Sequence, residues 1–393
     1  MRSQTPPDPF AFPANGSTRS FGILSSFPPT ACGIATFSAA LAAGLIAEGS
    51  TVDVVRCGAA PPMEDALVLA SLDESASGGL DVAVDALNRT DVAVIQHEYG
   101  LYGGADGDAV LDVMAEVVVP SIVVAHTVVS EPSAHQRTVL EGVCDAADAI
   151  VVMTSTAHGR LLAGYDVDSS KVTIIPHGAS TPTTGDLEDD GPTDRAPRLL
   201  TWGLLGPGKG IEWAIDAIAS LHRLRPRPNY VIAGATHPKV IAQSGEAYRE
   251  MLIRRAWSSR AAPFVTFDGV YRDLAALTQL IHSADLVVLP YDSEDQVTSG
   301  VLVDAVAAGR PVVSTAFPHA VELLSTGAGS VVPQRDPVAL AAAIRMVLTD
   351  RDLAASMAAE ARRLAPGLSW GAVAGRYGLL AEQLLARHDR VPT

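Results

Sequence analysis

The 393-residue chain has few of the residues that build disulfide, metal or nucleic-acid sites. Its three cysteines, Cys32, Cys57 and Cys144, are odd in number and widely spaced, so they form no disulfide or metal framework, which fits a reducing compartment. The net charge of −16 disfavours nucleic acid as a partner. There is no G-x-S-x-G elbow and no cysteine–histidine pairing, which leaves little support for a hydrolase.

Long apolar runs are missing as well. None approaches the roughly 18–20 residues needed to cross a bilayer, and no apolar region follows the early arginine as it would in a secretory signal. Hydrophobic residues make up 48% of the chain and are mostly aliphatic, which favours buried parallel strands covered by helices. We expect a soluble, cytoplasmic protein of two domains, because the chain is too long for one compact core.

Strand-like and helix-like patterns alternate along two successive stretches of the chain. Short apolar runs recur from Phe21 to Ile175 and again from Leu199 to Val332. Segments of helical periodicity separate most of them, such as Ile34–Glu48 with an apolar stripe. This alternation predicts an α/β fold of two Rossmann-like, doubly wound domains that face a central cleft, the default place for a ligand.

Composition marks the expected domain boundaries. Residues 1–19 are rich in Pro, Ser and Asn and are predicted to form a disordered tail, and the acidic, Pro- and Gly-containing run 183–197 is predicted to be a linker. The N-terminal domain then covers residues 20–182 and the C-terminal domain residues 198–369. Residues 370–393 are expected to form a further amphipathic helix, for which packing back on the N-terminal domain is one arrangement.

The segment Leu289–Ser314 is the most informative part of the sequence. It reads as a buried strand, a polar loop, a Ser-Gly pair that opens a helix, a carboxylate within that helix, and a second buried strand. The amides of Ser299 and Gly300 would point from the helix start, where the macrodipole favours an anion such as a diphosphate. Asp304, about one turn further, can accept hydrogen bonds from ribose hydroxyls. A nucleotide site is predicted here, with an ordinary βαβ unit as the alternative.

Two other loops between a strand and a helix are suited to phosphate. In the first, Gly33 lets the backbone approach a ligand at the helix start, although a proline-rich turn is the alternative. The second matches the G-x-x-x-x-G-K part of a P-loop, but Gly210 stands where a magnesium-binding Ser or Thr would be needed. Lys209, beside Gly208, is therefore predicted to be a phosphate-binding cation outside a P-loop NTPase, with a merely solvated lysine as the alternative.

Polar residues follow two neighbouring strands of the N-terminal half. His97 and Glu98 follow one strand and His126 follows the next, where side chains of such sheets point into the ligand crevice. We predict that they bind sugar hydroxyls, with structural hydrogen bonding as the alternative. A metal is disfavoured because no H-E-x-x-H spacing is present. His177, in an Ile-Pro-His-Gly segment, is either a residue of the cleft rim or a turn histidine.

Taken together, these segments resemble a GT-B glycosyltransferase of family 4. The resemblance covers about residues 20–350 and is carried by the Pro-Pro-Thr-Ala-Cys-Gly-Ile-Ala-Thr loop, Ile-Pro-His-Gly, Gly-Pro-Gly-Lys-Gly-Ile-Glu and, most specifically, Ser-Gly…Asp…Ala-Ala-Gly-Arg-Pro-Val-Val. It implies a retaining hexosyltransferase that uses a nucleotide diphosphate sugar and needs no metal or other cofactor. The donor would bind the C-terminal domain, and a carbohydrate or other hydroxyl acceptor the N-terminal one. GDP-mannose and UDP-glucose both fit, with mannose slightly favoured.

The resemblance also implies roles for single residues. Lys209 resembles the family's diphosphate-binding lysine, and the amides of Ser299 and Gly300 resemble its phosphate-cradling loop. Gly33 resembles a glycine that lies near the diphosphate. Asp304 matches the second glutamate of an E-x7-E element, the one that holds the ribose.

The implied reaction centre departs from the family pattern at two positions. His126 resembles the histidine beside the donor sugar, but Gln296 stands where the first glutamate of E-x7-E would contact that sugar. Leu204 replaces an arginine whose charge would face the leaving diphosphate, and one such contact is worth about 10²–10³ in rate. His97 and Glu98 are assigned to the acceptor side.

These departures keep other functions open. Glu294 or Asp295 could supply the missing carboxylate only at a different spacing. Gln296 and Leu204 together motivate a non-catalytic nucleotide-sugar-binding protein as one alternative. Another GT-B enzyme, such as a sugar epimerase or a glycoside phosphorylase, is the other.

Overall fold

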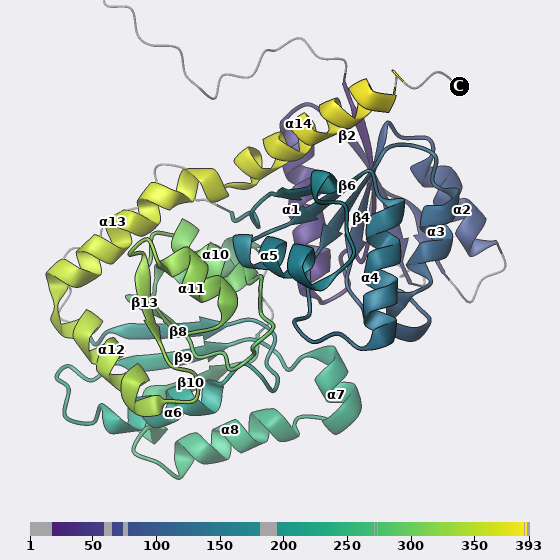
Figure 1. Ribbon diagram of the computed structural model, residues 1–393. Helices are drawn as coiled ribbons and strands as arrows, with labels where there is room; N and C mark the ends of the chain where they lie inside the picture. Colours follow the sequence, from purple (N-terminus) through teal and green to yellow (C-terminus); the bar gives the residue numbers. More distant parts are fainter. Residues whose placement is uncertain are drawn as a thin grey trace, which may run out of the picture.

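A computed structural model describes residues 18–58, 65–73, 78–180, 195–270, 272, 274–388 and 390. Nearly all of the predicted tail 1–19 and most of the predicted linker 183–197 lie outside these residues. Within them, the chain forms two parallel sheets, one of seven and one of six strands, each with helices on both faces (Figure 1). The predicted α/β class with two Rossmann-like domains is therefore confirmed.

The N-terminal sheet has the strand order β3-β2-β1-β4-β5-β6-β7. Its strands are β1 (Ser20–Ser25), β2 (Thr51–Cys57), β3 (Val68–Leu72), β4 (Val92–His97), β5 (Ser121–Ala125), β6 (Ala149–Val152) and β7 (Val172–Ile174). The helices that follow the strands are α1 (Gly33–Ala47), α2 (Gly79–Leu87), α3 (Val110–Glu116), α4 (Ala134–Ala146) and α5 (Ser155–Gly164). Helices α2 to α5 pack on one face and α1 on the other. Consecutive residues of a strand such as β4 enter opposite cores, which explains the unbroken apolar runs in the sequence.

The C-terminal sheet has the strand order β10-β9-β8-β11-β12-β13. Its strands are β8 (Arg198–Trp202), β9 (Asn229–Ala233), β10 (Val265–Asp268), β11 (Leu286–Leu289), β12 (Val312–Thr315) and β13 (Gly329–Val332). Its helices are α6 (Ile211–Ser220), α7 (Pro238–Ser244), α8 (Ala247–Trp257), α9 (Leu274–His282), α10 (Gly300–Ala307), α11 (Pro318–Leu324) and α12 (Pro337–Thr349). Helices α6, α8 and α12 cover one face, and α9, α10 and α11 cover the other.

Both sheets reverse their strand order at one point, between β1 and β4 in the first sheet and between β8 and β11 in the second. In doubly wound sheets, ligands bind outside the carboxyl ends of the strands at such a switch point. The loops after β1, β4, β8 and β11 are therefore the places where the fold itself predicts a site. They include every loop that the sequence analysis singled out for phosphate.

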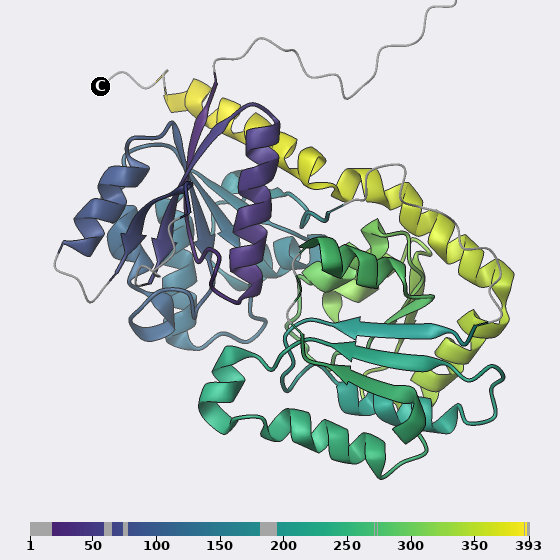
Figure 2. The same ribbon diagram turned by 180° about the vertical axis from the view of Figure 1, so that it is seen from behind.

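Two long helices end the described chain and connect the domains. Helix α13 (Arg351–Leu368) packs on the C-terminal domain, and α14 (Trp370–His388) continues from it along the N-terminal domain (Figures 1 and 2). Val373, Ala374 and Tyr377 of α14 are buried in the core that α1 covers. Conversely, Val297 from the loop after β11 is buried in the N-terminal core. Both cores of the N-terminal domain thus contain residues from the C-terminal half of the chain.

Among the described helices, none combines the length and the apolar character that a membrane span requires.

Candidate active site

The glycine loop between β8 and α6 packs against the loop that follows β11. Gly208 and Gly210 have positive φ angles of 89° and 60°. A Cβ at Gly210 would lie 1.9 Å from the carbonyl oxygen of Pro290, so a larger residue would push the two loops apart. The amide of Asp292 donates to the oxygen of Gly208 at 3.1 Å. The structure therefore brings together two segments, 200 to 212 and 289 to 300, that the sequence analysis assigned separately to the donor.

Lys209 lies on this glycine loop with its ammonium group over an aromatic ring. Its Nζ is 4.2 Å from the centroid of Tyr291, and Tyr291 stacks on Phe317 at 5.0 Å. The ring face attracts the cation and limits where the flexible side chain can go. Within the part of the chain that the structure describes, no carboxylate comes within 4.0 Å of this ammonium. Its charge is therefore available to an anion.

The start of α10 is the second predicted anion-binding feature. Ser299 caps the helix, its Oγ accepting the amide of Leu302 at 3.3 Å. The sequence predicts that the Ser299 amide is free to bind an anion. This prediction is wrong for this conformation, because the amide donates to Nδ1 of His319 at 2.8 Å. Gly300 opens the helix, and its amide has no acceptor within it. A Cβ on Gly300 would lie 2.8 Å from Nε2 of His177, so the helix start meets the end of the N-terminal domain.

Asp304 faces a small cavity beside α9. Ser180 and the α9 residues Leu277 and Thr278 line this cavity together with the aspartate. Burial raises the pKa of Asp304 to about 7. In the described residues its carboxyl group has no hydrogen-bond partner, so a ligand that donates hydroxyl groups would satisfy it.

The loop that carries Gln296 is fastened to the N-terminal domain. Oδ1 of Asp295 accepts from the Ser130 hydroxyl at 2.7 Å and from Nη1 of Arg160 at 3.1 Å. Burial alone would raise the pKa of Asp295, but the hydrogen bonds from Ser130 and the charge of Arg160 lower it overall. Gln296 uses its side-chain amide to donate to the oxygen of Thr298. Asp295 therefore serves the domain contact instead of replacing the missing glutamate, and Gln296 closes its own loop.

His126 follows β5, the strand that pairs with β4 beside the N-terminal switch point. Its Nε2 is 2.7 Å from Oε1 of Gln96, and Phe37 packs on the ring edge-on at 4.9 Å between centroids. Burial, followed by the nearby His177 and His97, lowers the pKa of His126 to about 3. The ring is therefore neutral at physiological pH. Because the Gln96 oxygen is an acceptor, the ring proton is on Nε2, and Nδ1 is left to accept.

The two predicted acceptor residues differ in accessibility. His97 is 1% exposed, its ring nitrogens are buried without partners among the described residues, and burial lowers its pKa to about 4. It cannot reach a ligand in this conformation. Glu98 accepts from the Thr127 hydroxyl at 2.6 Å and from the Tyr99 amide at 3.2 Å. Burial raises the pKa of Glu98, against these two hydrogen bonds. Glu98 is thus the better oriented candidate of the pair.

Gly33 is the first residue of α1 and is exposed. The Sγ atom of Cys32 caps this helix by accepting the amide of Ala35 at 3.3 Å. No heavy atom lies within 4 Å of the position that a Cβ on Gly33 would take. Packing within the protein does not require a glycine here, which leaves room for a ligand at the helix start.

Some site residues were missed or undecided in the sequence. His177 donates from Nδ1 to the oxygen of Gly178 at 2.6 Å, so its unprotonated Nε2 faces the start of α10. The Ile-Pro-His-Gly segment indicated this residue, but the sequence could not decide whether His177 is a residue of the cleft rim or a turn histidine. Gln96 and His319 gave no signal, because their partners are distant in the sequence. Trp370, which packs on the Phe37 ring at 5.1 Å, comes from the far end of the chain.

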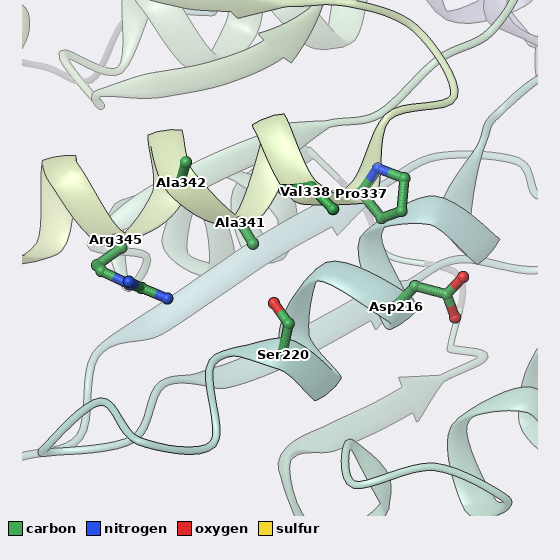
Figure 3. A pocket seen from close by; sticks show the side chains of 7 residues that line it. All are labelled: Asp216, Ser220, Pro337, Val338, Ala341, Ala342 and Arg345. Carbon is green, nitrogen blue, oxygen red and sulfur yellow. The ribbon is translucent and has the colours of Figure 1, made fainter.

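A pocket of about 350 Å³ lies away from these residues, between α6 and α12 (Figure 3). Its apolar lining residues are Pro337, Val338, Ala341 and Ala342, and Arg345 lies at one end. Its acidic residue, Asp216, is already paired with Arg255. The pocket is on an outer face of the C-terminal domain, so we do not place the reaction there.

The geometry defines a class of protein before any comparison is made. Two Rossmann-like domains meet at their switch points, an unpaired ammonium and a free helix start lie on one side, and a neutral histidine lies on the other. This is the arrangement of a GT-B fold. Among the described residues, no cluster of three or more His, Cys, Asp or Glu side chains could hold a metal ion.

Comparison with solved structures supports the fold. The chain superimposes on sucrose-phosphate synthase from Thermosynechococcus elongatus with a TM-score of 0.74 and 20% identity, covering 94% of this chain and 100% of the other. It superimposes on HepE from Anabaena in complex with UDP-glucose with a TM-score of 0.70 and 15% identity, covering 93% and 100%. These likenesses establish the GT-B architecture over nearly the whole chain.

Sequence comparison finds a family match in the C-terminal half of the chain. Residues 196–350 are similar to the family model for glycosyl transferases group 1. It is 29% identical to the glycogen synthase of Mycobacterium tuberculosis over 232 residues, which is 58% of this chain and 52% of that protein. It is 30% identical to the D-inositol 3-phosphate glycosyltransferase of Kineococcus radiotolerans over 259 residues, 59% of this chain and 56% of the other. The chain spans about half the length of the curated relatives it matches.

Proposed function

We propose that this protein is a retaining hexosyltransferase that moves a hexose from a nucleotide diphosphate sugar to a hydroxyl acceptor. The observation that carries the proposal is the unpaired ammonium of Lys209 on a glycine loop that touches the loop leading into α10. Supporting it, the solved neighbours include complexes with UDP and with UDP-glucose, and the relatives in sequence are named as glycosyl-transferring enzymes.

In this proposal the C-terminal domain binds the donor. Lys209 and the amide of Gly300 neutralise charge on the departing diphosphate, and Asp304 accepts hydrogen bonds from the ribose. Gly208 keeps the glycine loop in shape, while Ser299 acts through its helix cap and its bond to His319. Gly33 gives the diphosphate access from the other domain.

The N-terminal domain orients the sugar and the acceptor. His126, held by Gln96, presents a neutral acceptor nitrogen to a hydroxyl of the hexose, and Gln296 orients the same sugar from the domain-bridging loop. Glu98 is the proposed contact for the acceptor hydroxyl, since it is held by Thr127. Catalysis is then mainly positioning and electrostatics, and no metal or other cofactor takes part in it.

The sugar, the base and the location are finer parts of the proposal. Mannose remains slightly favoured on the resemblance, with GDP-mannose as donor, and glucose follows from the UDP-glucose complex of a neighbour. The acceptor is a carbohydrate or another hydroxyl compound, and we propose the cytoplasm as the location.

Nucleotide binding and transfer test the proposal directly. Thermal unfolding is measured with GDP, UDP and ADP, and one of them at a hundred times its Kd should add about 2.7 kcal/mol to the stability. Transfer is then assayed with the matching sugar nucleotides. If none of the nucleoside diphosphates stabilises the protein, the proposal is wrong.

Two alternatives are separated by the same assays. Donor isomerisation without an acceptor would favour an epimerase, and phosphate-dependent cleavage of a glycoside without a nucleotide would favour a phosphorylase. Tight nucleotide binding with neither sugar transfer nor slow hydrolysis of the donor would favour a binding protein. The departures from the family pattern at Gln296 and Leu204 motivate this alternative.

A further inference from the structure

The segment that follows β9 runs beside the glycine loop. The amide of Leu205 donates to the oxygen of Ala235 at 2.9 Å, and the amide of His237 donates back to the oxygen of Leu205 at 2.8 Å. Helix α7 begins immediately afterwards, and a Cβ on Gly206 would lie 3.1 Å from Val240. The start of α7 is therefore held against the loop that carries Lys209.

Lys239 is the second residue of α7 and lies two positions after His237, whose amide is bonded to the glycine loop at Leu205. Burial lowers the pKa of His237, and the charges of Lys239 and then Lys209 lower it further. Nδ1 of His237 accepts the amide of Lys239 at 3.1 Å, which leaves the proton of the neutral ring on Nε2. The ring N–H of His237 and the ammonium of Lys239 thus belong to a segment that is bonded to the glycine loop of Lys209.

Lys239 also reaches the N-terminal domain. Its Nζ is 3.5 Å from the oxygen of Gly100, and its charge acts on the buried Glu98. In the described residues no carboxylate lies within 4.0 Å of Nζ of Lys239, just as for Lys209. The ammonium therefore bridges the two domains without an ion-pair partner.

Lysine is rare in this chain, which makes the arrangement informative. The sequence contains three lysines, at 171, 209 and 239, and carries a net charge of −16. Lys171 lies elsewhere, donating to the oxygen of Asp145 at 2.7 Å. The other two lysines lie on two segments that are bonded to each other, although like charges repel and carboxylates are plentiful. An anion bound between them would relieve that repulsion.

We propose that Lys239 is a second diphosphate-binding residue, whose ammonium contacts the same phosphate groups as Lys209 and links them to the N-terminal domain at Gly100. The inference rests on the proposed function, because it takes the anion to be the diphosphate of the donor nucleotide. A phosphate group on the acceptor has the same chemistry. The donor is favoured because His237, which accepts the amide of Lys239, is itself bonded through its backbone to the loop that carries Lys209.

Titration calorimetry with nucleoside diphosphates tests this role. The wild type is titrated with GDP, UDP and ADP, and the one that binds is used for Lys239→Met, Lys239→Arg and the matched control Lys171→Met. We expect Lys239→Met to weaken diphosphate binding by about 10- to 100-fold, because a charge-assisted contact is lost. The corresponding monophosphate should lose less. Lys239→Arg should retain most of the affinity, and Lys171→Met should bind like the wild type.

The outcomes separate this inference from the proposed function. If the wild type binds no nucleoside diphosphate, the proposed function fails first. If the wild type binds one and Lys239→Met binds it equally well, the role of Lys239 is overturned while the proposed function stands. An equal loss in Lys171→Met would mean a general effect of charge and would overturn the role. An unchanged diphosphate Kd with a raised KM for a phosphorylated acceptor would assign Lys239 to the acceptor instead.

Discussion

The two domains have the same strand order around their switch points, yet they place different chemistry there. At the C-terminal switch point, glycines in positive-φ conformations shape the loop that carries Lys209, and the ammonium group of Lys209 lies over the Tyr291 ring. Beside the N-terminal one, the neutral side chains of His126 and Gln96 are bonded to each other. The fold therefore determines where ligands meet, and the loops determine which ligand goes to which side. A charged leaving group suits the first side, and hydroxyl groups that must be oriented suit the second.

The largest expected effect comes from removing the unpaired cation of the C-terminal side. Lys209→Ala should lower kcat by about 10²–10³, because charge that develops on the leaving diphosphate loses one stabilising contact. Initial rates with a saturating donor measure it. Lys171→Ala is the matched control and should keep wild-type turnover, since its ammonium bonds to a surface carbonyl group. Full turnover in Lys209→Ala would contradict the claim that the C-terminal side stabilises the charge of the leaving diphosphate through Lys209.

Acid should affect the N-terminal side more than the C-terminal side. In the N-terminal domain, burial lowers the pKa of His97 to about 4, of His126 to about 3 and of His177 to about 4. In the C-terminal core near the site, among the described residues, burial lowers the pKa of His319 to about 4. The unfolded chain binds these protons near pH 6.5, so stability is present above that pH and is lost as the pH falls towards 4. Each group contributes at most about 1.4 kcal/mol per pH unit.

Hydrogen exchange at pH 7.5 and pH 5.0 measures this difference by domain. Protection of β4 and β5 should fall more than protection of β8 and β9. Replacing His97 by Gln should reduce the loss in the first sheet. Equal losses in both sheets would show that the buried imidazoles do not set the acid sensitivity.

A pair of glycine variants compares the two helix starts. Gly300→Ala places a methyl group 2.8 Å from the His177 ring, and we expect a loss of about 1–3 kcal/mol. Gly33→Ala meets open space at a helical position, so stability should change by less than about 1 kcal/mol. Urea unfolding measures both variants. A Gly33→Ala protein that is stable but binds nucleotide more weakly would sharpen the assignment of α1 to the diphosphate.

A pH-dependent effect on folding is expected from Asp304. Its pKa is raised to about 7, so the carboxyl group favours the folded state below its unfolded pKa near 4, and this contribution is lost as the pH rises through 7. Asp304→Asn should therefore be more stable than the wild type at pH 8, by at most about 4 kcal/mol, with the difference vanishing near pH 4. Thermal unfolding across this range measures it. The same variant should bind nucleotide more weakly at pH 8, and unchanged binding would remove Asp304 from the ribose site.

Much of the fold was predictable because buried parallel strands leave a strong pattern. The run Val92–Ile95 is apolar at every position, since its side chains alternate between two cores. Strand β3 was missed because it is short, lies at the sheet edge and is half-exposed. Helix α13 was missed because its alanine-rich stripe is weak and it contains Pro366.

The site was predictable where one loop contains the chemistry. Lys209 and Gly300 could be found because glycines and a lysine between a strand and a helix suggest phosphate on their own. The partner of His126, by contrast, is Gln96, thirty positions earlier in the chain. The engagement of the Ser299 amide depends on His319, which the sequence cannot place. His97 and Glu98 are adjacent in sequence, yet only packing shows that one is buried away and the other is held by Thr127.

The burial of Val297 and of helix α14 within the N-terminal domain has a consequence for how the molecule unfolds. A fragment ending before residue 290 would leave apolar gaps in both layers that flank its sheet, and each uncovered valine or tyrosine would cost roughly 1.5–3 kcal/mol. The two domains are separate in architecture, but the stability of the N-terminal domain depends on residues from the C-terminal half of the chain. Unfolding of the N-terminal sheet should therefore also release α14 and the loop that carries Val297.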